Sequence, residues 1–297
     1  MTNEQLELKI EDYLAQLTDV LKGQNKALIQ DVLYDSEEHI RSALAEQADV
    51  SFEQIIENWG SPVEVAKQYI DMESSVTFAF QGEEQKVELK SPVQWVLSSL
   101  SSAASYQALL YILLAIPLSL FYVFWLVLGA SSAIASVMLV GIPVLIIFMR
   151  TLPYISLFEG RLIEFFLNER MPRRLSHVPV SKEQSKLGLM GLLKQEILNV
   201  NKLRIVLYLF LFFPLSILYL SSVFVPVLFS VGLILSPIVD PLLHLWNPDF
   251  KVDIDWYWLP VSLPVGLCLL SLSLLWTKWV AKGHASLAKS LLIPFKG

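Results

Sequence analysis

The sequence predicts an all-α membrane protein, with an N-terminal cytoplasmic helical domain followed by four membrane-spanning helices. Of its 297 residues, 54% are hydrophobic and only 17% are charged, whereas soluble domains carry about 25% charged residues. Asp, Glu, Lys and Arg are missing from residues 91–149, 205–239 and 256–277. Since about 20 apolar residues cross a bilayer as a helix, we expect a multi-pass membrane protein.

Charge divides the chain into two parts. Residues 1–75 carry 16 acidic and 5 basic side chains, whereas the remainder carries 12 acidic and 17 basic. Phosphate would repel so acidic a domain, so we expect no direct nucleic-acid partner. The predicted organisation is an acidic helical domain at 1–75, a linker at 76–100, a first membrane repeat at 101–172, a basic cytoplasmic connector at 173–203 and a second membrane repeat at 204–297.

Within the acidic domain, apolar residues recur at helical spacing in four segments. The first ends at Gly23, and the second begins at the Asn25 cap and runs to about residue 44. Ser51 caps a third, short helix, which Gly60 ends because glycine adopts a left-handed backbone. Ser61 then caps a last helix from residue 62 to about 72, with proline first and glutamate three residues after the cap.

Two stretches of this domain carry a family resemblance. The runs at 34–40 (YDSEEHI) and 58–70 (NWGSPVEVAKQYI) resemble the bacterial HAAS domain, an α-helical signalling module, and the resemblance covers about the first 72 residues. It implies a cytoplasmic adaptor without chemistry of its own. HAAS domains accompany separately encoded PadR-type regulators or precede membrane segments, so the resemblance implies a cytoplasmic protein partner.

The membrane part contains an internal repeat. The stretch from Tyr111 to Tyr122 reappears from Tyr208 to Tyr219 at a constant offset of 97, with Tyr, Pro, Leu, Ser and Tyr identical in register. The spacing predicts spans at about 106–128, 130–149, 205–227 and 256–277, with a turn at 129–132. Residues 228–239 either extend the third span or form a tilted or re-entrant segment.

Each repeat is expected to end in an amphipathic helix on the membrane surface. In the first, Glu159 and three further charged residues lie off an apolar face formed by residues such as Phe158 and Leu162. The second, near the C-terminus, shows the same pattern more weakly, with Leu287 and Lys289 among its members.

Loop charges predict the orientation. Residues 150–204 contain ten Lys or Arg, whereas the loop at 240–255 has four Asp and one Lys. Positive loops stay in the cytoplasm, so we expect a bacterial inner-membrane protein with both termini inside. The pattern over residues 100–292, with a VGIPV stretch at 140–144, is similar to the sensor region found ahead of some bacterial histidine kinases. No kinase domain follows in this sequence, so we expect a signal to leave through the N-terminal helices or a partner.

No catalytic, cofactor or metal site is expected, because the sequence lacks a phosphate loop, a zinc motif and a nucleophile elbow. His39 follows two glutamates, but adjacent helical residues point apart, so a packed or solvent-facing histidine is favoured over a ligand. The predicted spans hold no ionisable side chain in their cores, which disfavours a coupled pump.

Two sets of residues are candidates for function. One proline in each span favours a kink, either for packing or as a hinge. An acidic face of the helical domain is predicted to bind a partner or simply to meet water, and basic residues of the connector to bind that face or anionic lipid. The hinge candidates are Pro117, Pro143, Pro214 and Pro264; the acidic face is Asp31, Asp35, Glu38, His39 and Glu46; the basic set is Arg170, Arg173 and Arg174.

These patterns favour a non-enzymatic membrane sensor or regulator that passes a membrane or envelope state to a cytoplasmic protein through the helical domain. Membrane lipids are expected partners, and self-association stays open. The alternatives are a permease-like or accessory subunit of a transport complex, and a scaffold without a sensing role.

Overall fold

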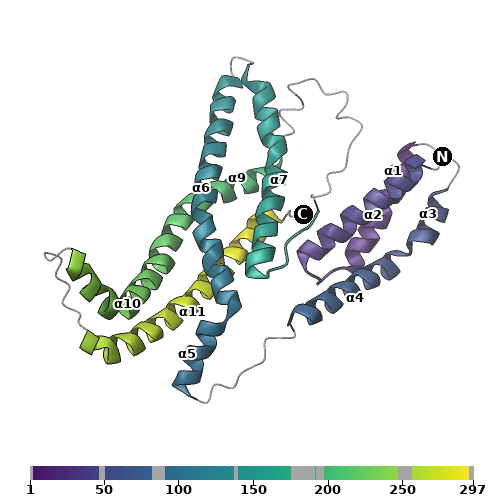
Figure 1. The fold of residues 1–297 in the computed structure, drawn as a ribbon. Helices are drawn as coiled ribbons and strands as arrows, with labels where there is room; N and C mark the ends of the chain where they lie inside the picture. The colour runs from purple at the N-terminus through teal and green to yellow at the C-terminus, as the bar shows by residue number, and fades with distance from the viewer. Residues whose placement is uncertain are drawn as a thin grey trace.

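The computed structural model describes residues 3–46, 51–81, 91–136, 140–174, 191, 197–246 and 256–293, and the regular elements within these ranges are all helical. Figure 1 shows the N-terminal helices as one domain beside a group that contains the longest helices, α6 (Ala103–Ala135) and α11 (Leu259–Leu292). The predicted all-α class is therefore confirmed.

The helical domain consists of α1 (Asn3–Val20), α2 (Lys26–Glu46), α3 (Phe52–Trp59) and α4 (Pro62–Gln81). Helix α1 packs against α2 and α4, and α2 also contacts α3 and α4. Helix α4 continues beyond the predicted end near residue 72. The core is the apolar stripe of each helix: Ile10, Tyr13, Leu14, Leu17, Leu21, Leu28, Val32, Leu33, Ile40, Ile55, Val65 and Ala66.

The predicted helix boundaries in this domain follow from local hydrogen bonds. The amide of Ala27 donates to Asn25 Oδ1 at 2.9 Å. Ser51 forms a capping box that begins α3. Ser61 begins α4 in the same way, its amide donating to Glu64 Oε2 at 2.9 Å. Gly60, between α3 and α4, has φ +116° and an ideal Cβ would lie 3.3 Å from Val65 Cγ2, so this turn requires glycine.

The membrane part begins with α5 (Pro92–Ser101), which leads into α6 (Ala103–Ala135) and α7 (Gly141–Leu167). Then α9 (Val200–Tyr219), a π-helical turn (Leu220–Phe224) and α10 (Val225–Trp246) form one long run, and a 3₁₀ turn (Trp256–Trp258) precedes α11 (Leu259–Leu292). Four helical stretches are long and apolar enough to cross a membrane: 103–135, 141–167, 200–240 and 259–292. Residues 228–239 extend the third of these.

The structure corrects the predicted turn of the first hairpin. Helix α6 runs through Gly129 to Ala135, and α7 begins at Gly141. An ideal Cβ on Gly129 would lie 2.5 Å from Phe148 Cζ, and one on Gly141 would lie 2.3 Å from the Ser132 carbonyl oxygen. These glycines therefore allow the two helices to approach closely, and Gly129 does not form a turn.

The amphipathic segments are also not separate helices. They are the last turns of α7 and α11, which continue without a break from the apolar spans. Glu159, expected away from the apolar face, is fully buried, and so is His284 on α11. The predicted spans themselves hold no ionisable side chain, but α7 and α11 extend beyond them and carry these two buried groups. The residue pattern of one helix does not show which face its neighbours cover.

Helices α6 and α9 carry the duplicated stretch and pack against each other. The hydroxyls of Ser119 and Ser216, which are equivalent in the two copies, lie 2.8 Å apart. Each serine hydroxyl also lies 2.7 Å from the carbonyl oxygen three residues earlier, that of Ile116 or Phe213. The two repeats therefore face each other at matching positions.

The predicted hinge prolines occupy two kinds of position. Pro117, Pro214 and Pro264 lie inside α6, α9 and α11. Pro143 lies in the first turn of α7, where a helix has no hydrogen bond for proline to remove. Pro153, which the sequence analysis did not single out, is the proline inside α7.

Candidate functional site

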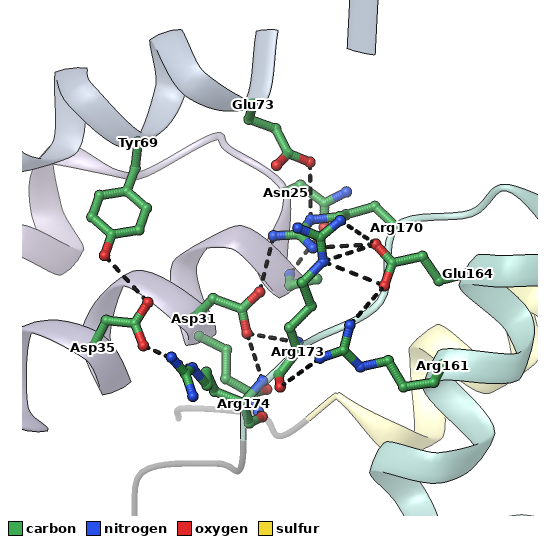
Figure 2. Close-up of polar contacts among 12 residues, drawn as sticks. Asn25, Asp31, Asp35, Tyr69, Glu73, Arg161, Glu164, Arg170, Arg173 and Arg174 are labelled. Atoms are coloured by element: carbon green, nitrogen blue, oxygen red, sulfur yellow. Dashed lines mark hydrogen bonds and ion pairs between the residues drawn. The ribbon is translucent and has the colours of Figure 1, made fainter. Parts of the chain in front are cut away.

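The helical domain meets the membrane part at the segment that follows α7. Helix α7 ends at Asn168, whose left-handed backbone (φ 54°) turns the chain out of the helix. Residues 169–174 then lie against α2 and α4 of the helical domain, and Figure 2 shows this junction. The short basic loop that follows a spanning helix thus binds the acidic domain through ion pairs.

Arg170 contacts three elements at once. Its Nη2 donates to Asp31 Oδ2 on α2 at 2.9 Å, and its Nε lies 2.9 Å from Glu73 Oε1 on α4. Its Nη1 lies 3.4 Å from Glu164 Oε1 on α7. The Arg170 side chain is 14% exposed and the Asp31 side chain 7%, so water screens this ion pair weakly.

Asp31 also binds the backbone of the loop. Its Oδ1 accepts hydrogen bonds from the amides of Arg173 at 2.7 Å and Arg174 at 2.9 Å. Burial raises the pKa of Asp31, while the amide of Arg173 and the guanidinium of Arg170 act against that rise. The loop therefore supplies the partners that compensate for burying this carboxylate.

Asp35, one helical turn after Asp31, pairs with the end of the loop. Its Oδ1 lies 2.9 Å from Arg174 Nε, and its Oδ2 accepts a hydrogen bond from the Tyr69 hydroxyl at 3.2 Å. The Arg174 guanidinium also lies 5.9 Å from the centroid of the Tyr34 ring. Burial, followed by the charge of Asp35, raises the pKa of Tyr69 to about 12.

Glu164 holds the basic loop on the membrane side. It accepts hydrogen bonds from Arg173 Nη2 at 2.7 Å and Nε at 3.0 Å, and this carboxylate raises the pKa of Arg173. Arg161, one turn earlier on α7, lies 3.8 Å from the same carboxylate. In Figure 2 these residues form one network with the aspartates of α2.

The sequence-predicted residues divide into two groups. The structure brings Asp31 and Asp35 against the arginines, whereas Glu38 and Glu46 are exposed elsewhere on α2. The His39 ring stacks on Trp59, with the ring centroids 4.0 Å apart. No group of three or more His, Cys, Asp or Glu within the described ranges could hold a metal ion.

The sequence patterns did not predict two acidic residues of the junction, Glu73 and Glu164. Glu73 lies on the part of α4 beyond the predicted helix end, and Glu164 was expected on a separate surface helix. A signal for Glu164 was available, because it lies six residues before Arg170 in a helix that ends between them. No pattern in the sequence indicated the contact of Glu73 with the loop.

A second polar cluster lies inside the membrane part. Glu159 on α7 and His284 on α11 are 3.9 Å apart (Oε1 to Nε2), and both are almost fully buried. Four tyrosine hydroxyls surround the pair, two from each copy of the repeated stretch: Tyr111, Tyr122, Tyr208 and Tyr219. The tyrosines that marked the repeat in the sequence are therefore the residues that enclose this pair.

Two family models match the chain, on separate segments. Residues 12–68 match the HAAS model, and residues 111–292, more than half of the chain, match the model described as “Putative sensor”. No curated protein and no solved structure matches. The HAAS domain is a protein-interaction domain, and both families, together with four apolar helices, fit a multi-pass membrane sensor. The chain belongs to the “Putative sensor” family and carries a HAAS domain ahead of its sensor region.

Proposed function

We propose that this protein passes a change in its membrane helices to a cytoplasmic protein through the loop at 169–174 and the HAAS domain. The observation that carries the proposal is Arg170, which binds α2, α4 and α7 simultaneously. A shift of α7 would move this side chain and alter the contacts that hold the helical domain. The proposal places both termini and this loop in the cytoplasm of a bacterium, at its inner membrane.

Charge and burial at the junction support a contact that can open. Arg174 is 52% exposed and its partner Asp35 is 24% exposed, so this outer pair contributes little to stability and is easily exchanged with water. The inner pair of Arg170 and Asp31 is more buried and fixes the position of the loop against α2. When the outer pair opens, the acidic face of α2 becomes available to a basic partner surface, and the arginines become available to anionic lipid.

A charge exchange tests the junction. In the full chain in bilayers, D35R should raise hydrogen exchange of the α2 amides, because two cations would then face each other. The double variant D35R/R174D should restore protection close to the native level. E57R makes the same change of net charge at an exposed acid of α3 and should leave α2 unchanged. Equal exchange in D35R, the double variant and the native chain would contradict the proposed contact.

Partner binding is the second part of the test. In-membrane crosslinking of the native chain followed by mass spectrometry should recover a cytoplasmic protein, and deletion of residues 1–75 should abolish its recovery. D35R should change the yield of that partner, and D35R/R174D should return it to the native level. An unchanged yield in all variants would leave the HAAS domain as a binding module that the membrane helices do not control.

Transport is the second candidate function, favoured by the buried Glu159 and His284. Ionisable groups inside spanning helices often belong to proton or ion pathways. Flux measured in proteoliposomes distinguishes this role from signalling: proton-coupled flux that disappears on substitution of His284 would favour transport, whereas its absence with partner binding intact would favour a sensor.

A further inference from the structure

We propose that His284, with Glu159 as its counter-ion, is a proton-binding site buried where the two membrane repeats meet. The proposed signalling function does not use this pair, and the inference stands on the geometry of the cluster whether or not the HAAS junction transmits a signal. Its ligand is a single proton taken up from solvent.

Glu159 accepts hydrogen bonds from three tyrosine hydroxyls. Its Oε1 accepts hydrogen bonds from the hydroxyls of Tyr111 at 2.6 Å and Tyr208 at 3.1 Å, and its Oε2 accepts one from Tyr122. Each phenol has one hydrogen to donate, so all three hydrogens point at this carboxyl group. A carboxyl group that accepts three hydrogen bonds fits its ionised form.

The first nitrogen of His284 is fixed by these tyrosines. Its Nε2 lies 2.6 Å from the Tyr111 oxygen and 3.1 Å from the Tyr208 oxygen. When both hydroxyls donate to Glu159, their oxygens face Nε2 as acceptors. In the proposed site Nε2 therefore carries the hydrogen of the neutral ring, and the free lone pair is on Nδ1.

The second nitrogen is the place where a proton can be added. His284 Nδ1 lies 3.0 Å from the Tyr219 hydroxyl. When the ring is neutral, Tyr219 donates to Nδ1. When a proton binds Nδ1, the new N–H donates to the Tyr219 oxygen after the hydroxyl hydrogen rotates away. Proton uptake thus reverses one hydrogen bond and leaves the three bonds to Glu159 unchanged.

The new positive charge would have one compensating charge nearby. Glu159 Oε1 lies 3.9 Å from Nε2 with both side chains at most 1% exposed. Among the described residues, the titratable groups that contact the ring from other helices are Glu159 on α7, Tyr111 on α6, and Tyr208 and Tyr219 on α9. Tyr122 on α6 contacts Glu159. On α11 itself, Lys282 is exposed and Lys289 pairs with Glu169. The phenols are neutral, so the site can hold one proton as a balanced ion pair.

Both copies of the duplicated stretch contribute tyrosines to the site. Tyr122 binds Glu159 and Tyr219, its equivalent in the second copy, binds His284. Glu159 and His284 begin matching segments at an offset of 125, with leucines at 162 and 287 and again at 167 and 292. The first repeat thus contributes the acid and the second repeat the base. Two like charges would repel, whereas this pair attracts when the histidine is protonated.

The first experiment compares stability at two pH values for the full chain in lipid nanodiscs. Protons stabilise the folded state only where it binds them more strongly than the unfolded chain does, and in the proposed site Glu159 supplies that difference. Lowering the pH from about 8 to about 6, the range in which histidine titrates, should then raise the melting temperature by at least about 2 °C. H284Q should remove this rise. H39Q, at the histidine that stacks on Trp59, should retain it. A rise in H284Q equal to that of the native chain would overturn the proposal.

A second measurement does not depend on the folding of a variant. Nitrogen NMR of the histidine-labelled native chain reports which ring nitrogens carry hydrogen. The resonance sets lost in H39Q, H177Q and H244Q identify those three histidines and leave the fourth set for His284. For His284 we expect a hydrogen on Nε2 at the higher pH and a second hydrogen added at Nδ1 as the pH is lowered. A ring that stays neutral over this range, or one protonated first on Nδ1 alone, would overturn the proposal.

Discussion

Single residues decide which contacts of the helical domain depend on pH. The hydroxyl of Tyr13, on α1, donates to the carbonyl oxygen of Gly60 at 3.0 Å. This bond ties α1 to the turn between α3 and α4, the turn that needs a glycine because its φ is positive. Burial, followed by the charge of Glu64, raises the pKa of Tyr13 to about 12. Ionisation of the Tyr13 hydroxyl would therefore break this hydrogen bond.

We expect alkaline pH to destabilise the helical domain through Tyr13. A tyrosine whose pKa is raised on folding contributes stability that is fully present below pH 10 and is lost as the pH rises through about 12. Y13F should lose about 1 kcal/mol at neutral pH, because the Gly60 carbonyl loses its donor, but should lose less stability between pH 10 and 12 than the native chain. Near-ultraviolet absorbance of phenolate, followed together with hydrogen exchange of α1, measures both effects. An equal alkaline loss in both proteins would contradict the assignment.

At the scale of helices, small residues set how closely the membrane elements pack. Gly129 faces the ring of Phe148 across the α6 and α7 hairpin, and Gly266 on α11 faces Ile234 of α10. In each case an ideal Cβ would lie 2.5 Å from a side-chain atom of the neighbour. Without a strong hydrophobic drive inside lipid, such close contacts hold spanning helices together.

This packing predicts opposite effects for two alanine substitutions. G129A should destabilise the full chain by about 1–3 kcal/mol, because the buried Phe148 ring has little room to move. G283A, on the helix α11, places its Cβ in open space and should stabilise by up to about 1 kcal/mol. Thermal unfolding in one detergent compares the two variants with the native chain. A melting temperature for G129A at or above that of G283A would show that the hairpin is not tightly packed.

At the scale of the whole molecule, α7 connects the two polar clusters. Glu159 lies in the buried cluster, and Glu164, on the same helix, binds Arg170 and Arg173 at the junction. Met171, next to Arg170, is also buried and lies against Gly160. A change at the buried pair therefore has a short physical route to the loop that holds the helical domain.

The junction should respond to salt in two steps. The exposed pair of Arg174 and Asp35 is screened by ions, whereas the buried pair of Arg170 and Asp31 is screened much less. Raising the salt concentration from about 0.05 M to about 0.5 M should therefore increase hydrogen exchange near residue 35 more than near residue 31. R174Q should reproduce the high-salt exchange near residue 35 at low salt. Equal salt effects at both positions would contradict the difference in burial.

Much of the architecture could be predicted from the sequence. Apolar spacing gave the helices of both parts, and the caps at Ser51 and Ser61 gave two boundaries, because these signals act within one helical turn. The repeat pointed to Tyr111 and Tyr208 before their surroundings were known. At the junction, complementary charge in the sequence indicated that Asp31 and Asp35 could bind the arginines. It did not indicate the geometry of their contacts.

Only the tertiary structure decided what the buried polar residues do. Glu159 and His284 are 125 residues apart, and each sits in a helical stretch that reads as amphipathic when viewed alone. Which side of α7 or α11 is buried depends on the helices packed against it, and the π-helical turn directly after Tyr219 is not indicated by residue spacing. The sequence by itself therefore determined the helices, the two-part organisation and the duplication, since these follow from local periodicity and composition. The ion-pair network at the loop and the enclosed acid and base needed the fold, because burial is a property of neighbours.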